Sequence, residues 1–213
     1  MSADEVRVLV ADDDTLVRSG LVALLQSDRA VRVVAEAATG REAVELSRRH
    51  AVDVALLDVR MPDLDGIAAA GDILRRDDPP RVVILTTFNE RAYLARALQI
   101  GVDGFLLKSG DPAELIRAVR GVSRGGLHLT PDVARMLVSV ASLRDVEIHD
   151  LSALTDRERD VLSLVSKGDS NADIASTLHI SEGTVKGHVS SIMARLGVTN
   201  RVQAAIIGHD AGL

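Results

Sequence analysis

The stretch RVLVADDDTLVRSG, residues 7–20, joins an apolar run to three consecutive carboxylates. The run Val6–Ala11 is rich in β-branched and aliphatic residues, which is typical of a buried β-strand. Asp12, Asp13 and Asp14 follow where this strand ends. Adjacent carboxylates repel one another, and burying them without a partner is costly. The pattern therefore indicates a site that holds either a divalent metal ion or a phosphoryl group.

Four further apolar runs follow the first one along the N-terminal half of the chain. They are Val31–Ala37, Val52–Asp58, Arg81–Thr87 and Gly104–Lys108. Segments with apolar residues at helical spacing lie between them, and the last helix begins at Pro112 with Asp111 as its N-cap. Strands that alternate with helices predict an α/β fold, a doubly wound five-stranded parallel sheet covered on both faces. Such sheets place their sites at the carboxyl ends of the strands.

The C-terminal part of the chain has a different pattern. We predict a first domain over residues 1–125, a linker with a helical segment over 126–151 and a small all-α domain over 152–213. The helical segment of the linker is expected from Thr130-Pro131 to about Ser142. In the all-α domain, the predicted N-caps are Thr155, Ser170, Ser181 and Asn200.

Composition limits the class of protein. The chain has 213 residues, which suffices for two domains, and it has no cysteine, so disulfides, thiolate metal sites and a cysteine nucleophile are excluded. We find no signal peptide and no apolar run near the ~20 residues that a membrane helix needs. We therefore expect a cytoplasmic protein that does not associate with a membrane. The net charge of −6 argues mildly against nucleic-acid binding. The net charge of the whole chain can, however, conceal a basic surface on one domain.

Polar residues stand at the ends of four of the five predicted strands. The ends of strands one and three can be neighbours in a parallel sheet, so Asp12, Asp13 and Asp58 can converge, and three carboxylates favour a hard cation such as Mg²⁺. Thr86 ends the fourth strand and Lys108 ends the fifth. Taken singly, they have simpler explanations: a helix cap for Thr86, a surface lysine for Lys108 and solvated acids for the rest. It is improbable that all five of these polar residues stand at strand ends by accident.

A phosphatase of the haloacid dehalogenase type is one interpretation of these acids. Its signature is a strand followed by Asp-x-Asp-x-Thr/Val, and Asp12 and Asp14 fit, but Leu16 departs from the last position. Thr86 and Lys108 can supply the later threonine and lysine. The final acidic pair at another strand end is missing, which argues against this interpretation.

The first domain resembles the receiver domain of two-component response regulators over residues 5–124. The matching residues are Asp12-Asp13, Asp58, Met61-Pro62, Gly66, Thr86 and Phe105–Lys108. The resemblance implies a flavodoxin-like fold in which Asp58 accepts a phosphoryl group from a sensor histidine kinase. It also implies that Asp13, Asp58 and the backbone carbonyl of Arg60 bind Mg²⁺, with Asp12 assisting. Lys108 would pair with the phosphoryl oxygens, and Thr86 would rotate to hydrogen-bond one of them.

Two residues depart from the receiver pattern. Phe105 stands where many receivers have tyrosine, and Ser109 follows the lysine in place of proline. Phe105 lacks a hydroxyl group, so any switching movement of this ring must act through packing. Asp14 occupies a variable position, and we expect it to cap the helix that begins at Thr15.

The C-terminal domain contains a predicted helix-turn-helix. Helices over Ser170–Leu178 and Ser181–Leu196 are joined by the short turn His179-Ile180, and the second helix would read the DNA. The residues expected to face the core are Val185, Val189, Ile192, Met193 and Leu196. The outer face carries Glu182, Gly183, Lys186, Gly187 and Ser190. A plain helical bundle with a solvated outer face is the alternative.

This segment resembles the LuxR-type DNA-binding domain almost from end to end. The matching residues are Leu154–Arg159, Ser170-Asn171, Ile174-Ala175, Ile180–Glu182, Thr184–Lys186, His188-Val189, Leu196–Val198 and Arg201. Together with a receiver, it resembles the NarL/FixJ subfamily. The resemblance places Lys186 and position 187, here glycine, in the major groove, and Ser190 stands where some relatives have a basic residue. Asn171, Thr184 and Arg195 are candidates for phosphate contacts.

Charge within the C-terminal domain is unevenly distributed. Residues 152–213 carry six basic and seven acidic residues, whereas residues 181–208 carry three basic residues and one acid. A weakly basic face predicts weak binding by one copy, so we expect a homodimer on paired half-sites of double-stranded promoter DNA. The chain is expected to be a phosphorylation-dependent transcription regulator and not an enzyme. A regulator whose receiver is never phosphorylated is a further alternative, against which the intact acidic site argues.

Overall fold

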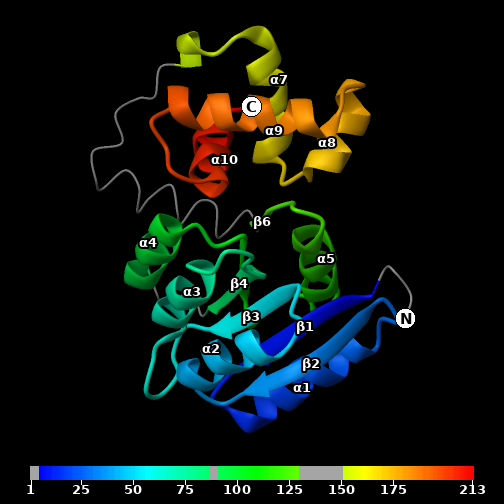
Figure 1. The fold of residues 1–213 in the computed structure, drawn as a ribbon, viewed down its shortest axis with the longest axis vertical. Coiled ribbons are helices and arrows are strands. Elements are labelled where there is room, and N and C mark those ends of the chain that lie inside the picture. Colours follow the sequence, from blue (N-terminus) through cyan, green and yellow to red (C-terminus); the bar gives the residue numbers. More distant parts are fainter. Residues whose placement is uncertain (1–4, 87–90, 130–150) are drawn as a thin grey trace.

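A parallel sheet forms the centre of the N-terminal domain. The computed structural model describes residues 5–86, 91–129 and 151–213. The strands lie in the order β2-β1-β3-β4-β5-β6, and every neighbouring pair is parallel (Figure 1). Their bounds are β1 Val6–Ala11, β2 Val31–Ala37, β3 Val54–Asp58, β4 Arg81–Thr86, β5 Gly104–Leu107 and β6 His128–Leu129. The parallel α/β fold predicted from the alternating runs is confirmed.

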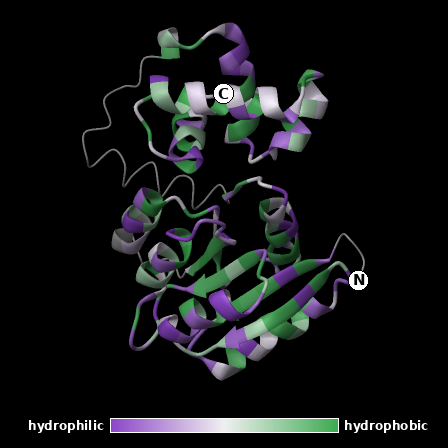
Figure 2. Ribbon diagram, viewed as in Figure 1, coloured by the Kyte–Doolittle hydropathy of each residue, from purple (hydrophilic) through white to green (hydrophobic). Residues whose placement is uncertain are grey.

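Helices cover both faces of the sheet. Those of the N-terminal domain are α1 Thr15–Gln26, α2 Gly40–Arg49, α3 Gly66–Leu74, α4 Arg91–Ile100 and α5 Pro112–Ser123. Side chains alternate between the faces of a strand, so Val8 and Val10 join the apolar cluster of α1 and α5. Leu9 and Ala11 join the cluster of α2, α3 and α4. Both faces are therefore apolar, and Figure 2 shows the central strands largely in green.

Within the described residues the sheet has six strands, one more than we predicted. In β6, His128 pairs with Gly104 and Leu129 with Phe105 of β5. Two residues are too short to show an alternating pattern, so the sequence carried no signal for this strand. The helix predicted from Thr130 to about Ser142 lies outside the described residues.

The C-terminal domain is helical. It contains a short 3₁₀ turn, η1 Leu151–Ala153, and the helices α7 Asp156–Ser166, α8 Asn171–Leu178, α9 Glu182–Arg195 and α10 Arg201–Asp210. All four predicted N-caps are confirmed: the side chains of Thr155, Ser170, Ser181 and Asn200 accept from backbone N–H groups one turn ahead. Within residues 5–86, 91–129 and 151–213, no helix combines the length and apolar character needed to cross a lipid bilayer.

Candidate functional site

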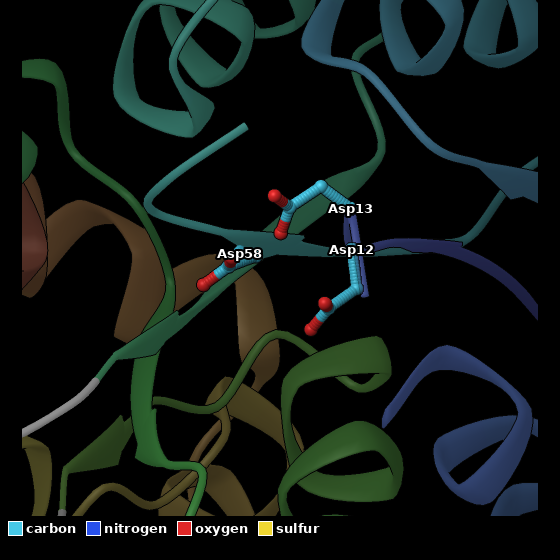
Figure 3. Close-up of side chains that lie close together, drawn as sticks. All are labelled: Asp12, Asp13 and Asp58. Atoms are coloured by element: carbon cyan, nitrogen blue, oxygen red, sulfur yellow. The ribbon is translucent and has the colours of Figure 1, made fainter. Parts of the chain in front are cut away.

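Three carboxylates meet at the carboxyl ends of β1 and β3. The two strands are paired so that Ala11 lies beside Leu57, which brings the residues that follow, Asp12 and Asp58, next to each other. One carboxylate oxygen from each of Asp12, Asp13 and Asp58 lies within 4.8 Å of the other two, and Figure 3 shows the three side chains around one space. Asp12 is fully buried, Asp58 is 5% exposed and Asp13 is exposed. The cluster is therefore open to solvent on the Asp13 side.

Lys108, which directly follows β5, neutralises part of this negative charge. Its Nζ lies 2.8 Å from Oδ2 of Asp12 and 2.8 Å from Oδ1 of Asp58. Burial raises the pKa of the Asp58 carboxyl, and the negative charges of Asp12 and Asp13 add to this rise, whereas Lys108 opposes it. Burial lowers the pKa of Lys108, but its hydrogen bonds to the two aspartates outweigh that effect and the net shift is upward. Lys108 is therefore held as a cation between the two buried carboxylates.

Two hydrogen bonds hold the chain around Asp12, one to its carboxylate and one to its carbonyl. Asp14 N–H donates to Oδ1 of Asp12 (3.0 Å), and Arg18 Nη1 donates to the Asp12 carbonyl (2.6 Å). Asp14 also caps α1, accepting from Leu16 N–H at 2.8 Å, as we predicted. Sequence reasoning missed Arg18, because a helical arginine carries no sign that its side chain turns back to the preceding strand.

The remaining predicted residues lie at or behind this cluster. Thr86 is the buried last residue of β4, and its carbonyl accepts from Lys108 N–H at 3.0 Å. Phe105 is fully buried in β5. Arg60 lies two residues beyond Asp58 and its side chain is exposed. Thr86 and Lys108 thus end adjacent strands beside Asp58, while Phe105 contributes to the core.

A second candidate site is the exposed face of α9. His179 has a φ of 54°, which places it in the left-handed region and turns the chain sharply between α8 and α9. The buried residues of α9 are Val185, Val189 and Ile192. The predicted contact residues Thr184, Lys186, Gly187 and Ser190 are all exposed. A Cβ atom at Gly187 would meet no atom within 4 Å, so this position lies against open space.

The other two residues predicted to contact DNA, Asn171 and Arg195, form hydrogen bonds within the protein. Oδ1 of Asn171 accepts from Nη1 of Arg201 at 2.6 Å. Nη1 of Arg195 donates to the Ala153 carbonyl at 2.5 Å, and its Nε lies 3.3 Å from Glu158. Arg195 keeps 47% of its side chain exposed. Both residues therefore support the helical domain in addition to any role at a surface.

Two protein families match the chain, one in each domain. Residues 8–120 match the family described as "Response regulator receiver domain". Residues 152–207 match the family described as "Bacterial regulatory proteins, luxR family". The two matches cover both domains, and the phosphatase interpretation is thereby set aside.

Curated relatives share both domains. The chain is 36% identical to the transcriptional regulatory protein LnrK of Bacillus subtilis (strain 168), over 98% of both chains. It is 34% identical to the transcriptional regulatory protein DegU of Brevibacillus brevis, over 97% of this chain and 94% of that protein. It is 37% identical to the response regulator VraR of Staphylococcus aureus (strain NCTC 8325 / PS 47), over 98% of both.

Solved structures lead to the same family. The response regulator ChrA of a heme-sensing two-component system aligns over 98% of both chains with a TM-score of 0.56 and 33% identity. A two-component response regulator RcsB–DNA complex aligns over 98% of this chain and 99% of RcsB, with a TM-score of 0.58 and 26% identity. The chain has a receiver-type sheet, an acidic cluster at its strand ends and a LuxR-type helix-turn-helix. It therefore belongs to the NarL/FixJ subfamily of two-component response regulators, which are transcription regulators and not enzymes.

Proposed function

We propose that Asp58 accepts a phosphoryl group from a sensor histidine kinase and that phosphorylation controls binding of the helical domain to promoter DNA as a homodimer. The observation that carries this proposal is the position of Asp58. It lies beside two other carboxylates, and the ammonium group of Lys108 is 2.8 Å from its Oδ1. That arrangement suits a nucleophile that must receive an anionic group.

The chemistry is a phosphoryl transfer between two side chains. An Asp58 oxygen attacks the phosphorus of a phosphohistidine, an O–P bond forms, the P–N bond breaks and the electron pair stays on the imidazole. The three carboxylates are hard oxygen donors of the kind Mg²⁺ prefers, so Asp12, Asp13, Asp58 and the Arg60 carbonyl would hold that ion. When bound, the ion supplies positive charge that offsets the acids and the incoming phosphate.

Phosphorylation adds roughly −1.5 to −2 charge at Asp58. Lys108 already contacts Asp58, and Thr86 ends β4, which pairs with the strand of Asp58, so both side chains can turn toward the new oxygens. Their movement changes the ends of β4 and β5 and biases the surface of β4, α4 and β5 between two states. Phe105 would follow through packing, because it is fully buried and has no hydroxyl group.

DNA binding would use the exposed face of α9. Lys186 and the open space at Gly187 would enter the major groove, with Thr184 and Ser190 beside them. Asn171 and Arg195 remain candidates for phosphate contacts, and each would exchange an internal partner for a phosphate oxygen. Because this face has few cations, we expect tight binding only when two copies occupy paired half-sites. The protein would work in the cytoplasm, where a bacterial regulator meets DNA.

A labelling experiment tests the proposed phosphorylation site. The full chain is incubated with acetyl phosphate and Mg²⁺, and intact-mass spectrometry is expected to show one added phosphoryl group. Asp58→Asn is expected to show none, whereas Asp63→Asn, an exposed acid in the loop that follows, serves as the matched control and labels normally. Equal labelling of Asp58→Asn and the unaltered chain contradicts the proposal. Mapping of DNA sites with and without the phosphoryl donor then tests the link to promoters.

A further inference from the structure

Arg18 joins the first turn of α1 to the chain that follows β1. Its Nη1 donates to the Asp12 carbonyl at 2.6 Å, and its own N–H donates to the Asp14 carbonyl at 2.9 Å. Side chains of a helix tilt toward the helix N-terminus, which is why Arg18 can reach back to Asp12. Its side chain is 15% exposed. The guanidinium group is therefore held against the main chain of the acidic cluster.

The carbonyl that Arg18 holds belongs to the peptide bond between Asp12 and Asp13. A peptide bond is planar and rigid, so a fixed Asp12 carbonyl also fixes the N–H of Asp13. The Asp13 carboxylate is exposed, and its place in the cluster depends on the main chain that carries it. Figure 3 shows the two side chains leaving the chain in different directions. A rotation of this one peptide plane would therefore change how the two carboxylates are placed.

The other polar groups of Asp12 are held as well. Its N–H donates to the Ala37 carbonyl of β2 at 3.1 Å, and its Oδ1 accepts from Asp14 N–H at 3.0 Å. Its Oδ2 lies 2.8 Å from Nζ of Lys108. Arg18 adds the contact to the carbonyl, so that both the N–H and the C=O of Asp12 have partners. The arrangement leaves the main chain at Asp12 little freedom to turn.

Glu36 of β2 forms an ion pair with Arg18. Its Oε2 lies 3.7 Å from Nε of Arg18, and 49% of the Glu36 side chain is exposed, so the pair contributes little to stability. Glu36 lies beside Val10 in the sheet, and Val10 faces the apolar cluster of α1 and α5. Glu36 therefore stands on the face of the sheet that α1 covers. Through this pair, β2 is linked to an acidic cluster to which it contributes no carboxylate.

We propose that Arg18, oriented by Glu36, is a positioning residue for the metal site: it holds the peptide bond between Asp12 and Asp13 so that the three carboxylates take one metal ion together. The inference rests on the proposed function in one respect, because it takes Mg²⁺ as the ion that the cluster holds. Mg²⁺ demands nearly octahedral oxygen ligands, so a displaced Asp13 is costly. Groups that orient metal ligands without touching the metal change metal affinity by about 10- to 100-fold.

The sign of the effect on Mg²⁺ binding separates this role from two others. Arg18 is a cation beside Asp12, so its loss would tighten Mg²⁺ binding if its charge were what mattered. Lys108, whose ammonium group contacts two of the carboxylates, is a cation of that kind. Loss of a residue that only stabilises the fold would lower the free energy of unfolding and leave Mg²⁺ affinity unchanged. Loss of a positioning residue weakens Mg²⁺ binding.

Titration calorimetry of the full chain with Mg²⁺ measures this sign. Arg18→Met keeps an unbranched side chain but removes the donors, and it is expected to weaken Mg²⁺ binding about tenfold. Arg18→Lys restores a cationic donor with a shorter reach and is expected to recover part of the affinity. Arg7→Met is the matched control, because Arg7 forms a 2.7 Å ion pair with Asp53 at the amino end of β1. It is expected to lower stability and leave Mg²⁺ affinity unchanged.

A double substitution tests whether Glu36 acts through Arg18. Glu36→Gln alone is expected to weaken Mg²⁺ binding about two- to fivefold, because it removes the charge that orients the guanidinium group. In the Arg18→Met background, the same change is expected to have no further effect. A direct electrostatic effect of Glu36 on the metal site would persist in both backgrounds.

Amide hydrogen exchange in the metal-free chain measures the positioning without Mg²⁺. The amides of Asp12 and Asp14 donate to the Ala37 carbonyl and to the Asp12 carboxylate. Their exchange, followed by NMR relative to that of Leu56 in the middle of β3, is expected to quicken about tenfold in Arg18→Met. In Arg7→Met, the ratio is expected to stay as in the unaltered chain.

Four results overturn the inference, and a fifth bears on the proposed function. Mg²⁺ binding by Arg18→Met that is as tight as that of the unaltered chain, or tighter, refutes the positioning role. Equal weakening in Arg7→Met refutes it too, as does unchanged exchange at Asp12 and Asp14 in Arg18→Met. An equal effect of Glu36→Gln in both backgrounds refutes its action through Arg18. A chain that binds no Mg²⁺ contradicts the proposed function, and the exchange rates then still decide whether Arg18 holds the peptide bond.

Discussion

The α-carbon of Gly66 packs against the main-chain carbonyl of Asp58, so that a Cβ atom at position 66 would lie 1.8 Å from the carbonyl oxygen. Gly66 N–H donates to the Val59 carbonyl at 2.9 Å, and Gly66 is the first residue of α3. The chain therefore folds back onto the end of β3, which carries Asp58, at a distance that only glycine permits. The glycine of the family motif acts here by holding the backbone of Asp58 in place.

Gly66→Ala is expected to displace Asp58 and slow labelling by acetyl phosphate. The methyl group cannot be accommodated without backbone movement, and the free energy of unfolding is expected to fall by about 1–3 kcal/mol. Gly71→Ala on the same helix is the matched control, because its Cβ would meet only the Arg75 guanidinium at 3.7 Å. Labelling at normal rate by Gly66→Ala would show that the close approach does not position Asp58.

Removal of divalent metal is expected to abolish phosphorylation. Asp12, Asp13 and Asp58 already crowd negative charge, and an incoming phosphate adds more. Labelling is expected to stop in excess EDTA and to return when Mg²⁺ or Mn²⁺ exceeds the chelator, measured by intact mass. Asp13→Asn, which removes the exposed member of the cluster, is expected to raise the Mg²⁺ concentration required. Undiminished labelling in EDTA would rule out a metal site here.

Lys108→Ala is expected to strengthen Mg²⁺ binding while it weakens the metal-free protein. Lys108 is a competing cation 2.8 Å from both Asp12 and Asp58, so its removal is expected to tighten Mg²⁺ binding at least about tenfold. Without Mg²⁺ at neutral pH, the unpaired carboxylates are expected to lower the free energy of unfolding by about 1–3 kcal/mol. Titration calorimetry and thermal unfolding measure the two effects. Lys167→Ala, in the other domain, is the control, and equal Mg²⁺ affinity of both variants would contradict the assigned role.

Lys186→Ala separates base reading from phosphate contact. Lys186 is exposed on α9, whereas Val185 and Val189 of the same helix are buried. If it reads a base edge, the change is expected to cost ~1–3 kcal/mol on a specific site and much less on random DNA. A phosphate contact would instead weaken both equally and reduce the salt dependence by about one charge. Fluorescence anisotropy with labelled duplexes distinguishes the base contact from the phosphate contact, and Lys167→Ala is the control. No change on either DNA would exclude Lys186 from the interface.

Phosphorylation is expected to strengthen binding to a two-half-site duplex far more than to a single half-site. The outer face of α9 is already exposed in this structure, so phosphorylation has no recognition helix to uncover. The gain is expected to come from pairing of two copies. Affinities are compared on both duplexes with phosphorylated and unphosphorylated protein. Equal enhancement on the two duplexes would refute the dimer mechanism.

The sequence by itself determined the parallel α/β sheet, the acids at its strand ends and the caps of the helical domain. These features are local, because alternating or helical periodicity and caps such as Thr155 and Ser181 involve residues only two to four positions apart. Convergence of Asp12 with Asp58 also followed from sequence, because parallel strands bring their carboxyl ends to one edge.

Only the tertiary structure decided which polar groups find partners far along the chain. β6 exists through its pairing with β5, and its two residues have no pattern of their own. Asn171 is held by Arg201 across 30 residues, and Leu98 is capped by Asn200 across 102. A helix-end carbonyl or an exposed amide needs a partner, but its own neighbourhood in the sequence does not say which one. The packing of the folded chain supplies that choice.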